Sequence, residues 1–265
     1  MMKCDYHIHT KLCKHAEGEM EAYVERAIEK GLKEIAFTDH IPLPDQFDIA
    51  HRMSLQEIDL YLERIFELKN QYPEIIIKAG IEADYYEGFE SFLEKILSSR
   101  PFDIVIMSVH FIRGWDNGNW AFKYDFPGKS MEQIYSEYLN AVMKGIKTGL
   151  FDIVGHLDLI KSTGHPLLET NQNEVEMVLK LVNEKNMAVE LNTSGLRKKI
   201  GEVYPDLSFL PLLDVNNIAV TLGSDAHKPE DTGFYFDEIL AKLSEFRNLR
   251  PVVFDKRKMI KDIKI

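Results

Sequence analysis

Histidine and carboxylate side chains occur in this sequence at spacings that suit metal binding. His7 and His9 are two residues apart, and so are Asp225 and His227 near the other end of the chain. Residues two apart in an extended chain point to the same side, so each pair can bind one ion. Imidazole and carboxylate ligands together suit zinc, iron or manganese. The sequence therefore predicts a site for transition-metal ions.

Further candidate ligands, His40, Glu82, His110 and His156, also follow short apolar runs, and His15 lies in the loop after the first run. Each has a simpler explanation alone, because nearby histidines can bond to each other and a glutamate can be a solvated strand end. With the two pairs, however, the set includes seven of the nine histidines. Gathering them without metal would leave buried imidazoles unpaired, at a cost of about 1–3 kcal/mol each. We therefore favour metal binding.

Apolar runs typical of strands alternate along the chain with amphipathic stretches typical of helices. Strands are predicted at residues 3–8, 34–38, 75–83, 103–108, 151–155, 188–192 and 218–223. Helices are predicted at residues 19–30, 54–71, 89–98, 130–147, 173–184 and 232–246, with a short one near 207–213. Gly31 is expected just after the first helix, Ser54 and Glu57 as a capping box on the second, and Asn171 or Asn173 as a cap further on.

This alternation implies an α/β fold with a mainly parallel sheet and right-handed crossovers. Seven strands at these spacings, with no linker-like segment between them, predict a seven-stranded TIM-like (β/α)7 barrel that occupies residues 1–265 as one domain. Barrels of this kind place their sites at the C-terminal ends of the strands. The candidate ligands lie at or just beyond those predicted ends.

Charge and composition exclude several classes of function. The chain has 32 Lys and Arg against 43 Asp and Glu, a net charge of −11, and an acidic surface repels nucleic acids and anionic membranes. No stretch is apolar enough to span a bilayer, and the N-terminus does not read as a signal peptide. Cys4 and Cys13 have no Cys-x-x-Cys spacing. We expect a cytoplasmic protein with a small-molecule substrate, and the sequence leaves its oligomeric state open.

In order and type, the motifs resemble those of the PHP (polymerase and histidinol phosphatase) family. The resemblance runs from Cys4 to about Phe236 and rests on His7-Ile8-His9, Thr38-Asp39-His40, Gly80-Ile81-Glu82, Ser108-Val109-His110, Gly155-His156 and Ser224-Asp225-Ala226-His227. It implies a distorted seven-stranded barrel with a trinuclear centre of zinc, iron or manganese. Residues 108–111 and 190–198 further resemble the monofunctional histidinol-phosphate phosphatases of that family.

The resemblance implies which residues hold each of the three ions. The first ion would be held by His7, His9, Glu82 and Asp225. Glu82 would bridge to the second ion, which is also held by His110 and His156. The third ion would be held by His15, His40 and His227. No ligand of the pattern is missing from the sequence, which favours a working centre.

The chemistry expected of such a site is the hydrolysis of a phosphate ester. Adjacent cations would neutralise the phosphate oxygens, lower the pKa of a bridging water and stabilise the leaving alkoxide, so we expect in-line attack by a metal-bound hydroxide. Glu82 is the expected bridge. Asp225, His227 or a water on the third ion would protonate the leaving group, and the sequence does not rank these three.

Two arginines are candidates for binding the substrate phosphate. Arg197 lies in a Ser-Gly turn after a predicted strand, and its planar guanidinium suits phosphate oxygens. The alternative interpretation is that Arg197 is a solvated cation in the basic run at residues 197–199. Arg113, just past His110, is the second candidate.

Other residues near the motifs have two readings. The loop at residues 115–124 holds both tryptophans, which either stack on a substrate imidazole or pack at the barrel mouth. Asp39 and Asp158 either orient ligand imidazoles or cap strand ends. His51 and His165 match no motif and are expected to be loop residues.

The leading hypothesis is metal-dependent hydrolysis of L-histidinol phosphate to L-histidinol and phosphate, a step of histidine biosynthesis. The choice of this substrate follows from the family resemblance. One alternative is a phosphatase or phosphodiesterase of the same family that acts on nucleotides or sugar phosphates. A more distant alternative is a metal-binding regulatory module without turnover, and an exonuclease role is disfavoured because the chain is acidic.

Overall fold

The fold is known from a computed structural model, which describes residues 3–115, 120–122, 128–163 and 171–260. Within these residues, seven parallel strands form one sheet in the order of the sequence. The strands are β1 (Cys4–Ile8), β2 (Glu34–Phe37), β3 (Ile76–Asp84), β4 (Ile104–Ser108), β5 (Ile153–Val154), β6 (Ala188–Asn192) and β7 (Ala219–Gly223). Each predicted strand is present, and most strand bounds differ from the prediction by one residue or two.

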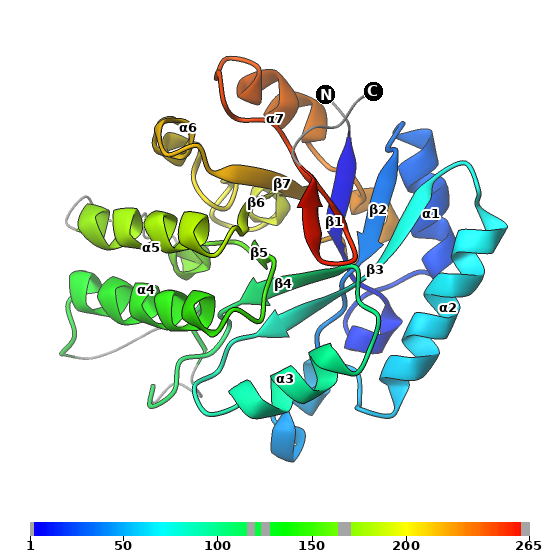
Figure 1. The fold of residues 1–265 in the computed structure, drawn as a ribbon, viewed down its shortest axis with the longest axis horizontal. Coiled ribbons are helices and arrows are strands. Elements are labelled where there is room, and N and C mark those ends of the chain that lie inside the picture. Colours follow the sequence, from blue (N-terminus) through cyan, green and yellow to red (C-terminus); the bar gives the residue numbers. More distant parts are fainter. Residues whose placement is uncertain (1–2, 116–119, 123–127, 164–170, 261–265) are drawn as a thin grey trace.

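The sheet curls into a barrel whose first and last strands meet. The backbone N–H of His9 donates to the carbonyl of Ala226 at 2.9 Å, and the N–H of Ala226 donates to the carbonyl of His7 at 3.2 Å. These bonds lie beyond the C-terminal ends of β1 and β7, so closure occurs at the end of the barrel where the candidate ligands are found. Figure 1 shows β1 and β7 as neighbours. The predicted seven-stranded (β/α) barrel is confirmed.

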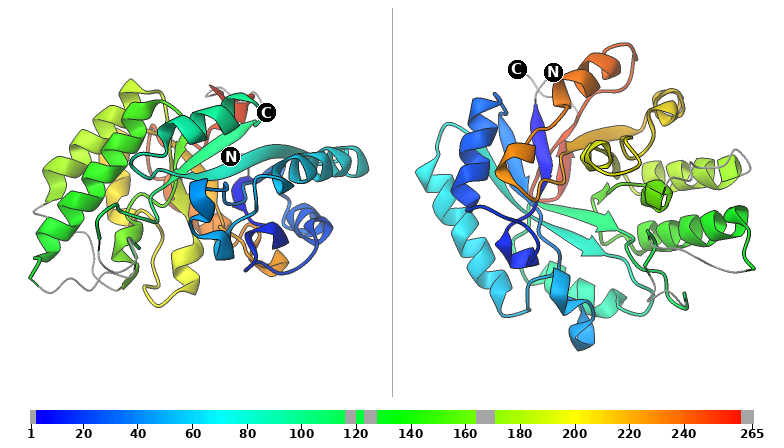
Figure 2. Two further views of the ribbon diagram at one scale, coloured as in Figure 1. Left: turned by 90° about the horizontal axis from the view of Figure 1, so that it is seen from below. Right: turned by 180° about the vertical axis from the view of Figure 1, so that it is seen from behind.

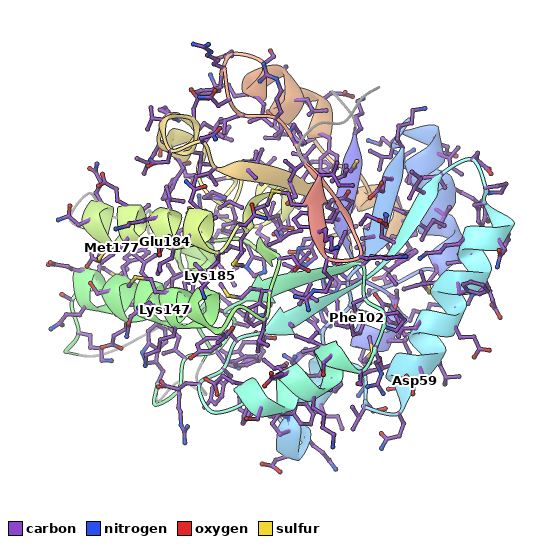
Figure 3. The ribbon with its side chains drawn as sticks, in the orientation of Figure 1. Asp59, Phe102, Lys147, Met177, Glu184 and Lys185 are labelled. Atoms are coloured by element: carbon purple, nitrogen blue, oxygen red, sulfur yellow. The ribbon has the colours of Figure 1, made fainter. Side chains whose placement is uncertain are left out.

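Helices follow the strands and cover the outside of the barrel (Figures 1 and 2). They are α1 (Met20–Glu29), α2 (Glu57–Gln71), α3 (Glu90–Ser98), α4 (Met131–Thr148), α5 (Gln172–Glu184), α6 (Leu210–Val215) and α7 (Phe236–Leu243). Their outer faces carry charged side chains such as Lys147 and Glu184 (Figure 3). Their inner faces join the main core, which contains Leu139 of α4 and Val178 of α5.

Short 3₁₀ turns fall in the connecting loops. They are Lys11–Cys13, Pro44–Gln46, Ile49–His51, Leu159–Thr163, Ser194–Arg197, Leu207–Phe209 and Pro229–Asp231. Several of these turns stand on the loops that follow strands, so they set the direction of side chains at the mouth of the barrel.

Three helix starts differ from the prediction. Ser54 does not cap α2: its N–H donates to Glu57 Oε2 at 2.7 Å, but a turn separates it from the helix, which begins at Glu57. The last helix begins at Phe236 rather than 232, because Tyr235 adopts a left-handed conformation with φ of 63°. Asn171 precedes α5, but its side chain bonds Ser136 Oγ at 3.2 Å and makes no cap bond. Gly31, with φ of +71°, follows α1 as predicted.

A C-terminal hairpin that the sequence did not predict closes the other end of the barrel. It consists of β8 (Val253–Asp255) and β9 (Lys258–Ile260), drawn in red across the front of the barrel in Figure 1. Phe254 packs into the inner core with Tyr6 and Ile106. Arg257 bonds Asp152 just before β5, with Nε 2.9 Å from Oδ2. The N-terminal end of the barrel is thus filled, and the opposite end carries the polar groups.

None of the helices in the described parts of the chain is long and apolar enough to cross a membrane.

Candidate metal centre

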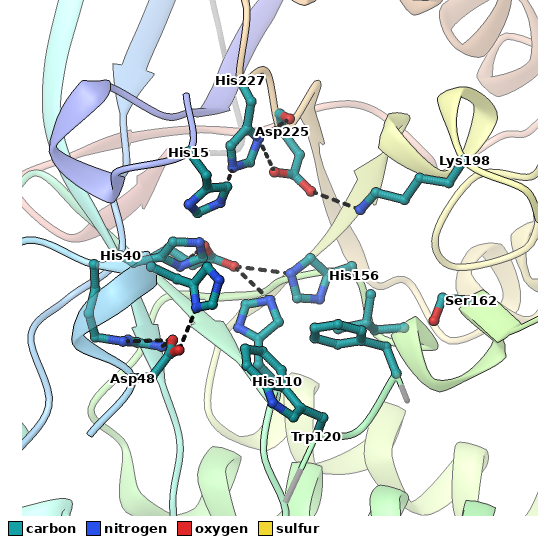
Figure 4. Close-up of a pocket in the computed structure, with 15 residues that line it drawn as sticks. His15, His40, Asp48, His110, Trp120, His156, Ser162, Lys198, Asp225 and His227 are labelled. Carbon is teal, nitrogen blue, oxygen red and sulfur yellow. Dashed lines mark hydrogen bonds and ion pairs between the residues drawn. The ribbon is translucent and has the colours of Figure 1, made fainter. Parts of the chain in front are cut away.

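All nine predicted ligands gather at the C-terminal end of the barrel. They come from β1, β3 and the segments beyond β1, β2, β4, β5 and β7: His7, His9, His15, His40, Glu82, His110, His156, Asp225 and His227. Seven of them line a cavity of about 370 Å³, and His7 and His9 are fully buried. Figure 4 shows the imidazoles turned toward one another around this cavity.

The innermost group of donors consists of the two β1 histidines and two carboxylates. His9 Nε2 lies 3.3 Å from Asp225 Oδ1 and 3.5 Å from Glu82 Oε2. His7 Nε2 lies 3.4 Å from the same Glu82 oxygen. The structure thus brings together the four side chains that the family resemblance implies for the first ion.

The second oxygen of Glu82 faces a different pair of histidines. Glu82 Oε1 lies 3.0 Å from His156 Nε2 and 3.7 Å from His110 Nε2, and Ser108 Oγ donates a hydrogen bond to it. His40 approaches from the other side, with Nδ1 2.8 Å from Glu82 Oε2. Glu82 thus presents its two oxygens to two separate groups of ring nitrogens, which is the arrangement a bridging carboxylate requires.

A third group of donors lies nearest the solvent, where His15, His40 and His227 have ring nitrogens within 4.8 Å of one another. His15 Nδ1 donates to the carbonyl of Cys13 at 2.7 Å, and His227 Nδ1 donates to the carbonyl of Asp225 at 3.0 Å. A neutral ring that donates through Nδ1 leaves Nε2 as a bare lone pair. The two Nε2 atoms lie 2.9 Å apart, and a cation bound by both would stabilise this arrangement.

Several of the buried atoms that could bind a metal have no hydrogen-bond partner within the described part of the protein. Within the described residues, His7 Nε2 and His9 Nε2 make no hydrogen bond, and His40 Nδ1 and Glu82 Oε2, although 2.8 Å apart, are not aligned for one. Buried polar atoms of native proteins are nearly always paired, so these orphaned donors fit a bound metal. Burial alone would raise the pKa of Glu82, but the imidazoles of His40, His7 and His110 outweigh it and hold that pKa well below its usual range. The carboxylate therefore stays ionised, as a metal ligand must.

Two buried carboxylates that the sequence analysis did not propose as site residues lie behind ligand imidazoles. Glu190 Oε1 lies 2.6 Å from His7 Nδ1, and Asp84 Oδ1 lies 2.9 Å from His110 Nδ1. A carboxylate on Nδ1 fixes the tautomer that leaves Nε2 free for a metal. Asp84 follows Glu82 by two residues in β3, so strand periodicity is the signal that could have found it.

Asp39 and Asp158 have different surroundings. Asp39 Oδ1 lies 3.4 Å from His9 Nδ1 without a hydrogen bond between them, and Thr10 Oγ1 donates to the other oxygen of Asp39. Asp158 instead pairs with the buried ammonium of Lys161 at 2.9 Å and accepts the N–H of Asp206 at 3.0 Å. Among the described residues, Asp158 makes these contacts rather than one with a ligand imidazole.

The two arginines predicted to bind phosphate do not line the cavity. Arg197 Nη2 donates to the carbonyl of Ser224 at 2.7 Å and of Asp225 at 3.2 Å, and its Nε lies 3.2 Å from Asp231 Oδ2. Its guanidinium thereby braces the segment that carries two ligands. Arg113 donates to the carbonyl of Glu87 at 3.1 Å and lines a separate hollow beside α4.

Other cations and polar groups occupy the cavity wall instead. Lys198 and Ser162 line one side, and Asp48, His51 and Arg52 line another. Lys198 Nζ lies 3.9 Å from Asp225 Oδ2. The loop histidine His51 is therefore part of the cavity, whereas His165 lies outside the described residues.

The tryptophan-containing loop is only partly described, since residues 116–119 and 123–127 lie outside the described residues. Trp120 and Phe122 line the cavity, with ring centroids 4.8 Å apart. Trp115 is buried, and its Nε1 donates to Glu137 at 2.6 Å. The predicted aromatic wall is therefore present at Trp120, while Trp115 packs into the core.

Comparison with known proteins identifies the family. A family model described as "PHP domain" matches residues 5–194. A "Histidinol-phosphatase" of Bacillus subtilis is 32% identical over 270 residues, covering 91% of this chain and 100% of that protein. A protein of Deinococcus radiodurans named "Probable histidinol-phosphatase" is 35% identical over 257 residues, covering 97% of this chain and 98% of that protein.

A solved structure is similar along nearly the whole chain. The histidinol phosphate phosphatase of Lactococcus lactis, complexed with zinc, L-histidinol and phosphate, is 26% identical with a TM-score of 0.77, and the match covers 98% of this chain and 99% of that one. The ordered ligand motifs, the barrel and these matches agree. This chain belongs to the PHP domain family.

Proposed function

We propose that this protein hydrolyses L-histidinol phosphate to L-histidinol and phosphate at a centre of three metal ions. One observation carries the proposal: a complete set of imidazole and carboxylate donors, several of them orphaned, lies at the mouth of a barrel similar to a structure that contains zinc, L-histidinol and phosphate. The relatives named as histidinol-phosphatases support the choice of substrate. We also treat residues 1–265 as one domain, because the C-terminal hairpin fills the barrel.

The residues present fit divalent metal ions. We propose that His7, His9, Glu82 and Asp225 hold one ion, that Glu82, His110 and His156 hold a second, and that His15, His40 and His227 hold a third. When bound, such ions neutralise a phosphate dianion and supply a water of lowered pKa as nucleophile. Imidazole-rich sets with carboxylates suit zinc, iron and manganese, and the zinc in the related structure favours zinc.

The chain's own residues supply the remaining requirements of the reaction. Asp225 and His227 both line the cavity, with Asp225 Oδ1 3.4 Å from His227 Nδ1. Burial would raise the pKa of Asp225, but His7 and Lys198 outweigh it and hold that pKa well below its usual range, so the carboxylate is ionised. Burial and the neighbouring His9 lower the pKa of His227 to about 3, so its ring is neutral at physiological pH. Neither side chain then holds a proton to give, and we propose that a water beside them protonates the leaving alkoxide. Lys198, with its side chain 48% exposed, is the cation placed to meet a phosphate oxygen.

The test is a comparison of kcat/KM over a panel of phosphate esters with protein loaded with zinc, manganese or iron. The panel contains L-histidinol phosphate, p-nitrophenyl phosphate, a nucleoside monophosphate and a sugar phosphate, with phosphate release as the readout. We expect a preference of at least about 100-fold for L-histidinol phosphate, since a site built for polar groups rejects analogues that lack them. Turnover should stop on chelation and return on metal addition.

A stronger preference for a nucleotide or sugar phosphate would overturn the substrate assignment but leave the hydrolase assignment intact. Metal binding without turnover of any ester would overturn both and favour a metal-binding module.

A further inference from the structure

A polar pair on the cavity wall takes no part in the proposed ligand sets. His51 and Asp48 stand on the segment after β2, and both line the cavity. His51 Nδ1 lies 2.6 Å from Asp48 Oδ1. The His51 side chain is 47% exposed, whereas the Asp48 side chain is only 8% exposed. The pair thus presents an accessible imidazole on a buried carboxylate.

The contact with Asp48 decides which His51 nitrogen faces a ligand. A carboxylate is an acceptor only, so Nδ1 must donate, and the neutral ring keeps Nε2 as an acceptor. The ring also lies edge-on to Trp120, with centroids 5.7 Å apart, and 5.6 Å from the ring of His15. A bound group at this place would meet a hydrogen-bond acceptor beside an aromatic face.

Arg52 holds this pair rigidly. Arg52 Nη2 and Nε donate to Asp48 Oδ2 at 2.8 and 3.2 Å, and Nη1 donates to the carbonyl of Ile41 at 2.8 Å. Arg52 itself is 2% exposed. Because the carboxylate is fixed on both oxygens, the orientation of His51 is set before a ligand arrives, which reduces the entropy lost on binding.

The charge on this side of the cavity is suited to a cation. Arg52 is shared between two carboxylates, since its Nη2 also lies 3.1 Å from Asp84 Oδ2, and the three groups together carry one net negative charge. Lys198 stands on the opposite side of the histidine cluster in Figure 4. The two sides of the cavity therefore differ in charge: Lys198 can meet phosphate on one side, and the Asp48, Arg52 and Asp84 group is net negative on the other.

We propose that His51, oriented by Asp48, is a specificity-determining residue that accepts an N–H from the alcohol portion of the substrate. The inference rests on the proposed function, because L-histidinol carries both an ammonium group and an imidazole with N–H donors. The substrate phosphate would lie toward the proposed metal ligands and Lys198, and the nitrogen-bearing end of the substrate would lie toward His51 and Trp120. An alcohol without N–H donors would leave His51 Nε2 unpaired and would bind less well.

The experiment measures selectivity in His51→Phe and Asp48→Asn, with Asp45→Asn as the matched control. Asp45 is an exposed aspartate on the same segment that does not line this cavity, so its variant removes one charge without touching the pair. His51→Phe keeps a ring but removes the acceptor. Asp48→Asn keeps the shape but can turn an amide N–H toward Nδ1, which forces the His51 tautomer whose Nε2 is a donor.

Two readouts are compared in each variant, with metal content measured throughout. The first is the ratio of kcat/KM for L-histidinol phosphate to kcat/KM for p-nitrophenyl phosphate. The second is inhibition of p-nitrophenyl phosphate hydrolysis by L-histidinol and by inorganic phosphate. We expect the ratio to fall about 10- to 100-fold in both variants, as for loss of a hydrogen bond to a charged group. Inhibition by L-histidinol should weaken in step, with the metals retained and Asp45→Asn unchanged.

An unchanged ratio with unchanged inhibition by L-histidinol would overturn the proposal. Equal losses on both substrates, or loss of metal, would also overturn it, because His51 would then act through the donor cluster. Failure of the proposed function looks different: the unmodified protein would show no preference for L-histidinol phosphate. Inhibition by L-histidinol would still report on His51 in that case.

Discussion

Glu190 lies directly behind His7, with Oε1 2.6 Å from Nδ1, and its other oxygen accepts the N–H of His156 at 2.9 Å. One carboxylate on β6 therefore fixes the ring of one proposed ligand and the backbone of another. The approach depends on Gly223 of β7, because a Cβ at that position would lie 1.9 Å from Glu190 Oε1. Three neighbouring strands thus determine the direction in which His7 Nε2 points.

Replacing Glu190 should weaken metal binding while leaving every proposed ligand in place. In Glu190→Gln, an amide that keeps its oxygen toward His7 must turn its N–H groups toward the N–H of His156, so one of the two bonds is lost. We expect metal affinity at the first position to fall about 10- to 100-fold. Competition with a zinc-binding dye measures this directly. Unaltered affinity in a protein of native circular dichroism would contradict the role given to Glu190.

Asp84 should act in the same way on His110, and a matched control exists at the other end of the barrel. Asp84→Asn removes the carboxylate from His110 Nδ1 and places an amide N–H near Arg52. We expect the ion held by His110 to dissociate about 10- to 100-fold more readily. The effect should vanish in a His110→Ala background, because Asp84 would have no ligand left to orient.

The control for Asp84 is Asp152→Asn. Asp152 is also a buried aspartate paired with an arginine, but it contacts Arg257 and the N–H of Val105, which is 2.8 Å from Oδ2, at the N-terminal end of the barrel. That variant should lower the melting temperature without altering metal affinity. If both variants lost stability alike and neither lost metal, Asp84 would be only a structural residue.

The sequence was sufficient to predict the barrel and the end of it at which the candidate ligands gather, because both follow from strand ends. An apolar run predicts a strand, and a histidine or glutamate at the end of the run marks its C-terminal end. Parallel strands place their C-terminal ends at the same side of the barrel, so these residues come together. Glu190 was harder to assign, since a glutamate inside a strand has no spacing that distinguishes a partner of His7 from a solvated residue. The hairpin at Val253–Ile260 was missed because three-residue strands carry too little periodicity.

The arginine assignment shows a different limit. Residues 194–197 form a 3₁₀ turn after β6, and the direction of each side chain depends on where that turn ends. The turn sends Arg197 to the carbonyls of Ser224 and Asp225 and leaves Lys198 beside the cavity. Neighbouring cations in a sequence run cannot be separated without that backbone geometry.

Glu82→Gln tests the bridge between the first and second ions. The amide has nearly the same size as the carboxylate but lacks its charge, and only one of its two ends can act as a metal ligand. We expect turnover to fall by at least about 1,000-fold, since the bridging charge is worth several kcal/mol at a site of adjacent cations, with at least one metal position lost by elemental analysis. Normal turnover with full metal content would show that Glu82 does not bridge.

Substitutions of Lys198 and Arg197 should have opposite effects on phosphate binding and on metal content. Lys198→Ala should leave metal content unchanged and raise both KM for the substrate and the inhibition constant of inorganic phosphate by about 10-fold or more, because a half-exposed cation facing phosphate is lost. Arg197→Ala should instead loosen the segment that carries Asp225 and His227, so metal content should fall before substrate affinity does. The contrary pattern, in which Arg197→Ala keeps its metals and loses phosphate inhibition while Lys198→Ala behaves normally, would restore Arg197 as the phosphate clamp. It would also require the guanidinium to leave the carbonyls of Ser224 and Asp225 when phosphate binds.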